Sequence, residues 1–469
     1  MPKASEILRN KLPFEPTAGQ NSAFVAIDWL IKDEGESKVL LVKGYAGTGK
    51  TTLTSVLVSV LPSFNFKYVL LAPTGRAAKV LSAYSKRMAF TIHKRIYKQV
   101  NTSGGGFYFK LQKNYAQDTI FIVDEASMIN DNAGFGNNGL LKDLMDYVFH
   151  NQSNRLILIG DNAQLPPVGQ NISPALNLVK LQNDFSVEAR AVALTEVRRQ
   201  TAESGILSNA TALRNYMGAE KPNIRFHTQP FNDIFKMTAE RMEDGIRYAY
   251  DNYGISDSIV ITRSNKAANL YNQYIRHQIH FYESELEAGE FLMVVKNNYL
   301  YTPDDKSGSF LANGDFVQVL KVFNPEEIHG LRFATLQLKM VDYPELESFD
   351  AKVILDTLHS EGPALSAEAS DQLYESVKAD YTHLSSPKEQ KEAIKKDPYL
   401  NALQVKFAYA ITCHKSQGGQ WAVVFLDQGF VQDDKIDDDY LRWLYTAVTR
   451  ATRQLFLVNF DNKFFVSPA

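Results

Sequence analysis

At 469 residues the chain is too long for one compact core, and its length predicts about two to four domains. Hydrophobic residues make up 45% and charged residues 22%, which is the composition of an ordinary globular protein. The 50 basic and 53 acidic residues give a net charge of −3, which excludes a chain that is basic throughout. A single cysteine, Cys413, excludes an internal disulfide framework and a multi-cysteine zinc site.

The apolar segments of the chain are short. The first residues, MPKASEILRNKLPF, lack the apolar core of a signal peptide. Mostly apolar stretches such as residues 56–61 are far shorter than the roughly 20 residues that span a bilayer. The sequence therefore predicts a cytoplasmic protein that does not associate with membranes.

Acidic residues are missing from one long part of the chain. Between Glu36 and Asp118 there are 81 residues without Asp or Glu, and 13 of them are Lys or Arg. A short run of this kind would indicate only a solvated basic face. Because this run is long and includes the glycine-rich motif described below, we favour a track for a polyanion, which gains affinity by releasing the counterions of its phosphates.

Short apolar segments alternate with helical patterns. In the first part of the chain we predict strands at residues 38–43, 68–72, 119–123 and 155–159. Such alternation favours a parallel, doubly wound α/β sheet, whose chemistry lies at the carboxyl ends of the strands. The pattern recurs in three further predicted strands, at residues 258–261, 423–426 and 454–458.

These patterns predict the domain organisation. A first lobe is expected over residues 1–200, with a two-stranded insertion around a glycine-rich turn at about 97–117. A second lobe is expected over residues 201–295 together with 404–469. The material between them, residues 296–403, begins with short strands and ends in polar helices, which predicts an inserted accessory domain.

A complete phosphate loop lies between the first predicted strand and a helix. Its glycines let backbone N–H groups turn toward phosphates, Lys50 reaches the β- and γ-phosphates, and Thr51 ligates magnesium. The alternative, a chance glycine-rich turn, is disfavoured by the flanking strand and helix. The residues predicted to bind ATP through this loop are Gly44, Ala46, Gly47, Thr48, Gly49, Lys50, Thr51 and Thr52.

Two polar motifs follow later strands. Asp124 and Glu125 close the strand at 119–123, where one carboxylate can hold magnesium and its neighbour can polarise the attacking water. Such a pair could also simply cap a helix, but its position downstream of Lys50 favours a catalytic role. Gln164, in the segment GDNAQ, is either a γ-phosphate sensor or part of a turn, and the residues alone leave both readings open.

Two arginine-containing segments, LTEVRRQ at 194–200 and YTAVTRATR at 445–453, could supply an arginine to the γ-phosphate. Such an arginine stabilises transition-state charge and is worth about 10³–10⁵ in rate in NTPases that use one. For either arginine alone, a surface salt bridge is the ordinary alternative. The acidic residues at 433–439 directly precede a predicted helix, and we interpret them as capping residues rather than as a metal site.

Taken together and in this order, the motifs resemble the superfamily 1 helicases of the 5′-to-3′ group, in particular the Dda-like and RecD-like enzymes. The resemblance is strongest over residues 15–200 and 404–455 and weak over 296–400. It implies two tandem RecA-like lobes of the P-loop NTPase class, with a β-hairpin insertion in the first lobe and an SH3-like and helical insertion in the second. It also implies a DNA helicase that hydrolyses Mg-ATP between its lobes.

The resemblance assigns a role to each motif. Gln20, in PTAGQNSAF, matches the glutamine that reads adenine. Glu125 matches the general base, and Asp124 assists magnesium together with Thr51. Gln164 matches the residue that couples the γ-phosphate to lobe closure. The arginines that reach the nucleotide from the second-lobe side are Arg199 and Arg450.

The resemblance also marks strand-binding positions in both lobes. Backbone contacts by hydroxyls, amides and lysines hold a strand without reading its bases, so we expect little sequence preference. A histidine taken alone would more often be packed or solvated, but the motif context favours binding. The matching residues are Pro73, Thr74, Arg76, Thr91 and His93 in the first lobe, and Thr262, Asn265, Thr412, His414, Lys415 and Ser416 in the second.

The predicted hairpin suggests a strand separator. Its Phe107, Tyr108 and Phe109 could stack on the last base pair, where aromatic stacking is worth about 1–3 kcal/mol per base. Packing under the hairpin is an equal alternative for any one of them. The chain departs from the RecD-like pattern at Gln420, where an acid is usual, and no extra domain precedes Gln20, which does not support a RecBCD-style subunit role.

The sequence therefore predicts an ATP-dependent helicase or translocase that moves 5′ to 3′ on single-stranded DNA and unwinds duplexes, as a monomer in a bacterial or phage-infected cell. Its expected ligands are ATP, Mg²⁺, single-stranded DNA and single/double-strand junctions, with replication or single-strand-binding proteins as further partners. Two alternatives share the motifs: a single-strand translocase that displaces bound proteins, and a regulatory P-loop ATPase without unwinding. The second alternative leaves the acid-free run unexplained.

Overall fold

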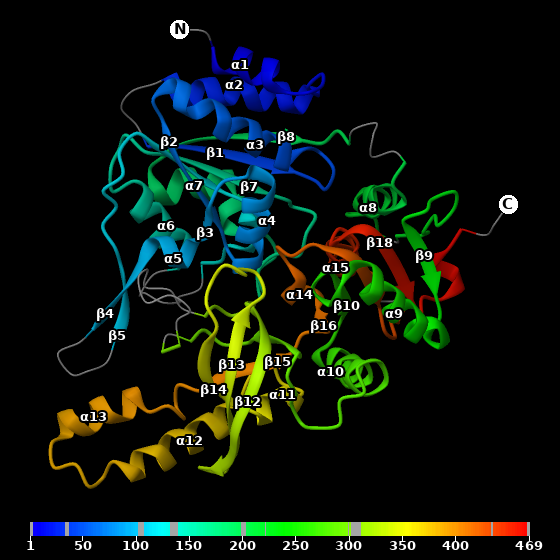
Figure 1. The fold of residues 1–469 in the computed structure, drawn as a ribbon. Helices are drawn as coiled ribbons and strands as arrows, with labels where there is room; N and C mark the ends of the chain where they lie inside the picture. Colours follow the sequence, from blue (N-terminus) through cyan, green and yellow to red (C-terminus); the bar gives the residue numbers. More distant parts are fainter. Residues whose placement is uncertain are drawn as a thin grey trace.

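The structure is a computed structural model that describes residues 3–32, 37–101, 107–131, 139–197, 203–220, 222–298, 300–301, 311–432 and 435–466, with side chains throughout except at 99–101 and 107–109. The described strands form two parallel sheets, a closed barrel and a two-stranded hairpin (Figure 1). All seven segments predicted as strands from their apolar character are strands.

The first sheet has six parallel strands in the order β3-β2-β6-β7-β1-β8. Alternate residues of each strand face opposite sides, so that Leu40 and Val42 pack on one face while Val39 and Leu41 pack on the other. Both faces are covered by helices, which explains why the central strands β6, β7 and β1 are mostly apolar runs. The strands are β1 (Lys38–Gly44), β2 (Lys67–Ala72), β3 (Ala89–Thr91), β6 (Thr119–Val123), β7 (Arg155–Gly160) and β8 (Glu188–Leu194).

Helices cover the first sheet on both sides. One face is covered by α1 (Ala4–Lys11), α2 (Ala18–Lys32), α3 (Lys50–Val60) and α4 (Gly75–Ser85). The other face is covered by α5 (Ile92–Ile96), α6 (Leu140–Val148) and α7 (Leu178–Phe185). The result is a three-layer α/β/α lobe, in which α3 and α4 each begin at the carboxyl end of a strand, as expected for a doubly wound sheet.

The second sheet has five parallel strands in the order β16-β10-β17-β18-β9. They are β9 (Ile234–Met237), β10 (Ser258–Thr262), β16 (Ala410–Thr412), β17 (Trp421–Asp427) and β18 (Ala451–Val458). Its helices are α8 (Gly205–Asn215), α9 (Met242–Tyr253), α10 (Asn265–Tyr274), α14 (Cys413–Ser416) and α15 (Asp438–Val448). The Asp437 side chain caps α15 by accepting a hydrogen bond from the Tyr440 N–H (2.9 Å), which confirms the capping prediction at this residue.

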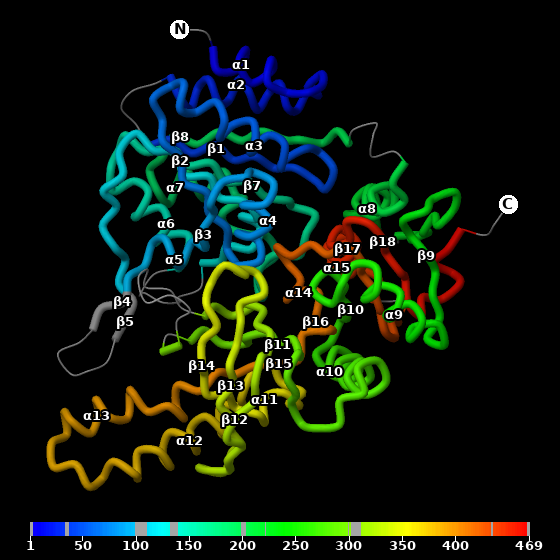
Figure 2. The backbone as a smooth tube through the Cα atoms, viewed as in Figure 1, coloured from blue at the N-terminus to red at the C-terminus, as the bar shows by residue number. Residues whose placement is uncertain are grey.

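The chain leaves the second sheet after α10 and returns at β16, and the excursion forms a barrel with a helical arm (Figure 2). The barrel strands are β11 (Phe291–Val294), β12 (Phe316–Ile328), β13 (Leu331–Met340), β14 (Phe349–Ile354) and β15 (Leu403–Phe407), with the short α11 (Asp356–His359) after β14. Its interior is continuous with the core on one face of the second sheet. The arm consists of α12 (Ala367–Asp380) and α13 (Pro387–Lys396), and α12 packs on the barrel through Leu373 and Val377.

The hairpin consists of β4 (Tyr97–Asn101) and β5 (Phe107–Leu111), which pair in antiparallel register beside α5 and α6 of the first lobe. Lys98 lies directly opposite Lys110 in this register. The side chains of Phe107, Tyr108 and Phe109, the predicted strand separators, lie outside the described residues. Within the part of the chain that is described, no helix combines the length and apolar character that crossing a bilayer requires.

Candidate active site between the two sheets

The phosphate loop connects the end of β1 to the start of α3. Gly47 and Gly49 have φ values of 76° and 88°, in the left-handed region that glycine adopts without strain. At Gly49 a side chain would also collide with Gln20, because a Cβ would lie 2.5 Å from Nε2 of that residue. The loop therefore needs glycine at both positions, and it presents the N-terminus of α3, the positive end of the helix dipole, to any bound anion.

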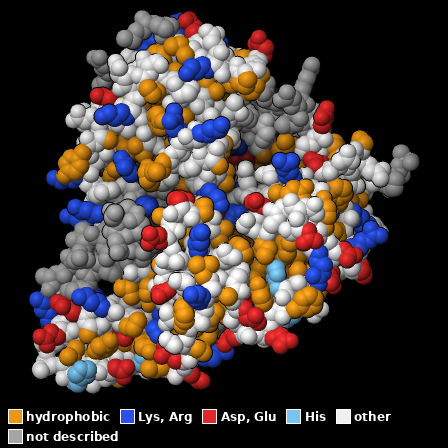
Figure 3. Space-filling model, viewed as in Figure 1, with side chains coloured by type: hydrophobic (Ala, Val, Ile, Leu, Met, Phe, Trp, Pro, Cys, Tyr) orange, Lys and Arg blue, Asp and Glu red, His pale blue; other side chains and the backbone are white. Residues whose placement is uncertain are grey.

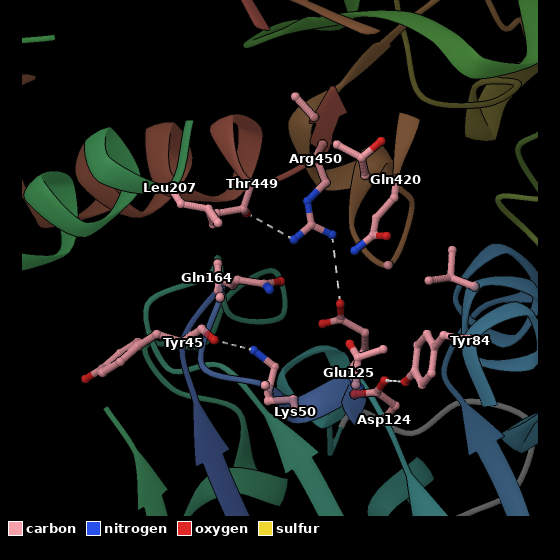
Figure 4. A pocket seen from close by; sticks show the side chains of 18 of the residues that line it. Tyr45, Lys50, Tyr84, Asp124, Glu125, Gln164, Leu207, Gln420, Thr449 and Arg450 are labelled. Carbon is pink, nitrogen blue, oxygen red and sulfur yellow. Dashed lines mark hydrogen bonds and ion pairs between the residues drawn. The ribbon is translucent and has the colours of Figure 1, made fainter. Parts of the chain in front are cut away.

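Lys50 lies across this loop. Its ammonium group donates hydrogen bonds to the carbonyl oxygens of Gly44 (2.6 Å) and Tyr45 (2.9 Å), as Figure 4 shows for Tyr45. It also lies 3.9 Å from the Asp161 carboxylate, whose side chain is fully buried at the end of β7. The lysine charge is thus held at the carboxyl edge of the first sheet.

Asp124 and Glu125 follow β6 at the same edge. Asp124 accepts a hydrogen bond from the Glu125 N–H (2.9 Å) and another from the hydroxyl of Tyr84 in α4. Glu125 has a φ of 52°, and its side chain is 20% exposed and lines the cavity described below. Burial therefore raises the pKa of Glu125, while the charge of Arg450 acts in the opposite direction.

Arg450 reaches this site from the second sheet. It lies just beyond the end of α15, is 3% exposed, and its Nη1 lies 3.9 Å from Oε1 of Glu125 (Figure 4). The guanidinium is oriented by hydrogen bonds to the carbonyl oxygens of Thr446 (2.9 Å) and Gly419 (3.2 Å) and to the Thr449 hydroxyl (3.2 Å). These bonds leave one edge of the arginine facing the glutamate.

Gln164 stands between the two sheets on the loop after β7. Its side chain is nearly buried, and its Oε1 has no hydrogen-bond partner among the described residues. A buried amide oxygen without a partner is costly, so it is expected to accept a hydrogen bond when a ligand or water is bound.

One cavity of about 460 Å³ collects these groups. Its walls come from both sheets: Gly49, Lys50, Thr51, Asp124, Glu125 and Gln164 from the first, and Gln420, Thr449 and Arg450 from the second. A lysine, amide groups and hydroxyls suit a polyphosphate. Among the described residues there is no group of three or more His, Cys, Asp or Glu that could hold a metal ion.

Several predicted nucleotide contacts lie away from this cavity. Gln20 is buried behind the phosphate loop, where its Nε2 donates to the Thr48 carbonyl (3.3 Å) and its Oε1 accepts from the Thr17 N–H (3.1 Å). Thr48 itself donates to the carbonyl of Tyr45 (2.8 Å). Arg199 lies outside the described residues. The predicted roles of Gln20 and Arg199 in nucleotide binding stay predictions.

Comparison with known proteins gives two family matches, one that includes the first sheet and one that includes β16, β17 and β18 of the second. Residues 25–225 match the AAA domain model, and residues 407–458 match the UvrD-like helicase C-terminal domain. The ATP-dependent RecD2 DNA helicase of Deinococcus radiodurans is 31% identical over 176 residues, which are 38% of this chain. The ATP-dependent DNA helicase dda of Enterobacteria phage T4 is 26% identical over 321 residues, 65% of this chain and 67% of that protein.

The chain therefore resembles the DNA helicases RecD2 and Dda, and its C-terminal match is to a helicase domain. The chain spans 22% of the length of the RecD2 helicase that it matches. Among solved structures, the Pif1 helicase from Bacteroides in complex with ADP-AlF3 and ssDNA has a TM-score of 0.47 and 17% identity, with 97% of this chain and 95% of that chain covered.

The predicted strand-binding segments lie at the carboxyl ends of four strands. In the first sheet they follow β2 and β3, which are neighbours at one edge, and in the second they follow β10 and β16, which are also neighbours at an edge. Thr74 and Thr91 cap the helices that begin there by accepting from the N–H groups of Ala77 (3.2 Å) and Lys94 (3.1 Å). The structure thus brings the four segments to corresponding edges of the two sheets.

The side chains at these positions differ in accessibility. Burial lowers the pKa of His93 to about 4, so its imidazole is neutral at physiological pH, whereas His414 is exposed. Lys415 donates to the Asn313 side chain (2.5 Å). The buried hydroxyls of Thr262 and Ser416 bond to the carbonyl oxygens of Ser264 (3.0 Å) and Cys413 (2.8 Å), so their predicted strand contacts stay predictions.

Arg76 lies in a junction that joins α4 to the second sheet and the barrel. Its guanidinium lies 4.3 Å from the ring centre of Trp421 and 4.8 Å from that of Phe316, and 3.5 Å from the carboxylate of Asp342. Asp342 also pairs with Lys79 at 3.2 Å. The arginine is 7% exposed and its charge is committed to protein partners, so its predicted contact with a nucleic-acid backbone stays a prediction.

Sequence reasoning missed three residues that shape the cavity. Tyr84 and Tyr445 orient carboxylates by hydrogen bonds, and Gln420 forms part of the wall at the position where an acid was expected. Nothing in the local pattern marks the two tyrosines, since each lies on the apolar face of a helix whose partners are distant in sequence. Gln420 was visible only as a departure from the family pattern.

The junction contains a carboxyl group whose titration tests this geometry. Asp315 is buried beside the junction and accepts a hydrogen bond from the Ala312 N–H (2.8 Å). Burial raises the pKa of Asp315 to about 7, Asp342 adds to this rise, and Lys94 opposes it. Between about pH 4 and pH 7 the folded chain thus holds a proton that the unfolded chain has released, so stability from this group falls as pH rises.

We therefore expect Asp315→Asn, which keeps an acceptor oxygen without a charge, to stabilise the folded chain by on the order of 2 kcal/mol more at pH 8 than at pH 5. Urea denaturation midpoints at the two pH values measure the difference. Asp350→Asn, at an exposed barrel position, is the matched control and should have little effect at either pH. An Asp315→Asn effect that does not depend on pH would contradict the assignment.

Proposed function

We propose that the protein is a DNA helicase, an ATP-driven motor that moves 5′ to 3′ along single-stranded DNA and unwinds the duplex ahead of it. The observation that carries this proposal is the shared cavity, in which Glu125 of the first sheet lies 3.9 Å from Arg450 of the second. A nucleotide bound there contacts both sheets, so its hydrolysis changes the contacts that hold them together. The similarity to RecD2 and Dda, both ATP-dependent DNA helicases, supports the same function.

The residues of the cavity suggest how ATP is held. The loop amides and the Lys50 ammonium bind the β- and γ-phosphates, and Thr51 and Asp124 are the residues that would hold Mg²⁺ beside them. When bound, the ion neutralises charge on the phosphate oxygens. Tyr84 holds the Asp124 carboxylate from α4, which restricts its rotation.

Hydrolysis uses groups from both sheets. Glu125 accepts the proton of the water that attacks the γ-phosphorus, while the bond from that phosphorus to the β–γ bridging oxygen breaks. The partnerless Oε1 of Gln164 accepts a hydrogen bond from that water and orients it. Lys50 and Arg450 stabilise the charge that develops on the phosphate oxygens. Because Arg450 arrives from the second sheet, turnover requires a closed cavity.

The same closure positions the strand-binding segments. We infer that the lobes are residues 1–200 and 201–295 with 404–469, both RecA-like, and that residues 296–403 form an SH3-like and helical accessory domain. The segments after β2 and β3 in one lobe and after β10 and β16 in the other then grip a strand alternately as the cavity closes and opens. Contacts from backbone-directed groups make this grip independent of base sequence.

The charge on the first lobe supports a polyanionic partner. Figure 3 shows Lys and Arg side chains spread over this face of the lobe, with few acidic side chains among them. Lys98 and Lys110 are both exposed and directly opposite on the hairpin, where like charges destabilise the strand pair. This cost is offset if the pair contacts phosphates of the DNA that the hairpin separates.

The first test is ATP hydrolysis with and without single-stranded DNA. We expect the DNA to stimulate turnover, and Glu125→Gln to lower kcat by roughly 10²–10⁴-fold while ATP binding is retained, because the general base is lost and the phosphate contacts are not. Glu368→Gln, at an exposed position of α12, is the matched control. A wild-type rate that DNA does not change would favour a regulatory ATPase and overturn the motor.

The direction of movement is tested separately with duplexes that carry a single-stranded tail at either the 5′ or the 3′ end. We expect displacement from the 5′-tailed duplex alone. Displacement from the 3′-tailed duplex alone would reverse the polarity and leave the motor intact. DNA-stimulated hydrolysis with no displacement from either duplex would favour a translocase that removes bound proteins.

The hairpin contact predicts a change in salt dependence. The double substitution Lys98→Ala/Lys110→Ala removes both lysines. It should weaken the salt dependence of binding to forked DNA, so that the negative slope of log affinity against log salt concentration becomes smaller in magnitude by about 1–2, because up to two phosphate contacts are lost. The control pair, Lys32→Ala/Lys67→Ala, removes exposed lysines at the opposite end of the first sheet. Equal slopes for the two double variants would exclude a specific contribution of the hairpin.

A further inference from the structure

One face of α15 holds the loop that follows β7. Arg442, Tyr445 and Thr446, spaced as neighbours on a helix surface, all bond to this loop. The Thr446 hydroxyl accepts from the Leu165 N–H at 2.8 Å, and Arg442 donates to the Asn162 carbonyl. The loop that carries Gln164 is thus attached to the second lobe although its chain belongs to the first.

Tyr445 is the member of this set that also reaches the phosphate loop. Its hydroxyl oxygen accepts a hydrogen bond from the Ala46 N–H at 2.8 Å, and its hydroxyl donates to the Asp161 carboxylate at 2.7 Å. The tyrosine is 1% exposed, and the Asp161 side chain is fully buried and 3.9 Å from the Lys50 ammonium. One phenol therefore joins an amide of the phosphate loop, a buried carboxylate and a helix of the opposite lobe.

Helix α15 links the Tyr445 hydrogen bonds to the position of Arg450. Arg450 lies five residues further along the chain, at the end of the same helix, and it is anchored to the helix through the Thr446 carbonyl. A displacement of α15 that breaks the Tyr445 bonds also moves the guanidinium away from Glu125. The apolar contacts of Ala163 and Leu165 with the second-lobe core tolerate a small slide, whereas the two hydrogen bonds depend on direction.

We propose that Tyr445 is a positioning residue that fixes Arg450 and Gln164 relative to the phosphate loop, so that turnover occurs only in the closed arrangement that the strand favours. This inference rests on the proposed function. According to this proposal, the Tyr445 hydroxyl group couples strand binding to ATP hydrolysis. The hydroxyl itself takes no part in bond breaking.

The test is Tyr445→Phe, which keeps the ring and removes both bonds. We expect the DNA-stimulated kcat to fall on the order of tenfold, because the catalytic groups are no longer held in register. The KM for ATP should change less than about threefold, since the phosphate contacts stay. Strand displacement per ATP hydrolysed should fall as well, a readout that a loss of stability alone does not change.

Tyr440→Phe is the matched control. Tyr440 is a buried tyrosine of the same helix whose hydroxyl donates to Gln428 within the second lobe, so its loss removes a buried hydrogen bond that does not cross the cavity. Melting temperatures of both variants report the structural effect. If Tyr445→Phe does not fold, Thr446→Val removes the neighbouring bond to the Leu165 N–H and should cause the same kind of kcat loss.

The outcomes separate the two proposals. If the wild-type rate does not respond to DNA, the proposed function fails whatever the variants do. If the wild type is stimulated and Tyr445→Phe keeps the same stimulation, KM and displacement per ATP as Tyr440→Phe, the positioning role is wrong and the motor stands. A matched loss of kcat in both tyrosine variants would likewise assign the effect to general packing of α15.

Discussion

The approach of Arg450 to Glu125 is possible only while the two sheets stand against each other. Each sheet carries part of the charge set, and neither can assemble it alone: the lysine and the carboxylates belong to the first, the arginine to the second. The side chains of Arg450 and Glu125 are both largely removed from solvent. An unpaired charge is costly in such a buried position. The shared cavity therefore makes the relative position of the lobes a determinant of the chemistry.

The apolar contacts across the cavity explain how this position is maintained. Ala163 and Leu165, which follow β7 of the first sheet, are buried in the core of the second. Apolar packing also holds the barrel in place, because its interior is continuous with the core on the other face of the second sheet. The pairing of Asp342 with Arg76 and Lys79 is therefore a contact between α4 of the first sheet and the barrel.

The fold could be predicted where the signal is local. Buried strands, the glycine loop and the carboxylates at the end of β6 are short patterns, and the physics that selects them acts within a few residues. The partners of those groups could not be predicted, because Ala46 and the Tyr445 hydroxyl are 399 residues apart and Lys79 and Asp342 are 263 apart.

The acid-free run shows the same limit for charge. Counting residues along the chain treats all 13 basic side chains as available, but Arg76 and Lys79 both form ion pairs with Asp342 from the barrel. The acid-free run contributes positive charge to the surface through exposed lysines such as Lys98 and Lys110. A linear charge pattern thus overstates the free charge of the segment that carries it.

Helix α4 shows how closure and grip become one movement in the proposed motor. Its first turn follows the predicted strand-binding segment, and there Gly418 of the second lobe, at a φ of 74°, packs so closely that a Cβ would lie 2.8 Å from that of Ala77. Near its other end, Tyr84 holds the Asp124 carboxylate at the cavity. A helix of this length transmits displacement as a rigid element, because its backbone bonds resist bending. In the proposed motor, a shift of the second lobe that changes the contact at Ala77 would therefore also move the group that orients Asp124, which would couple strand binding to nucleotide chemistry.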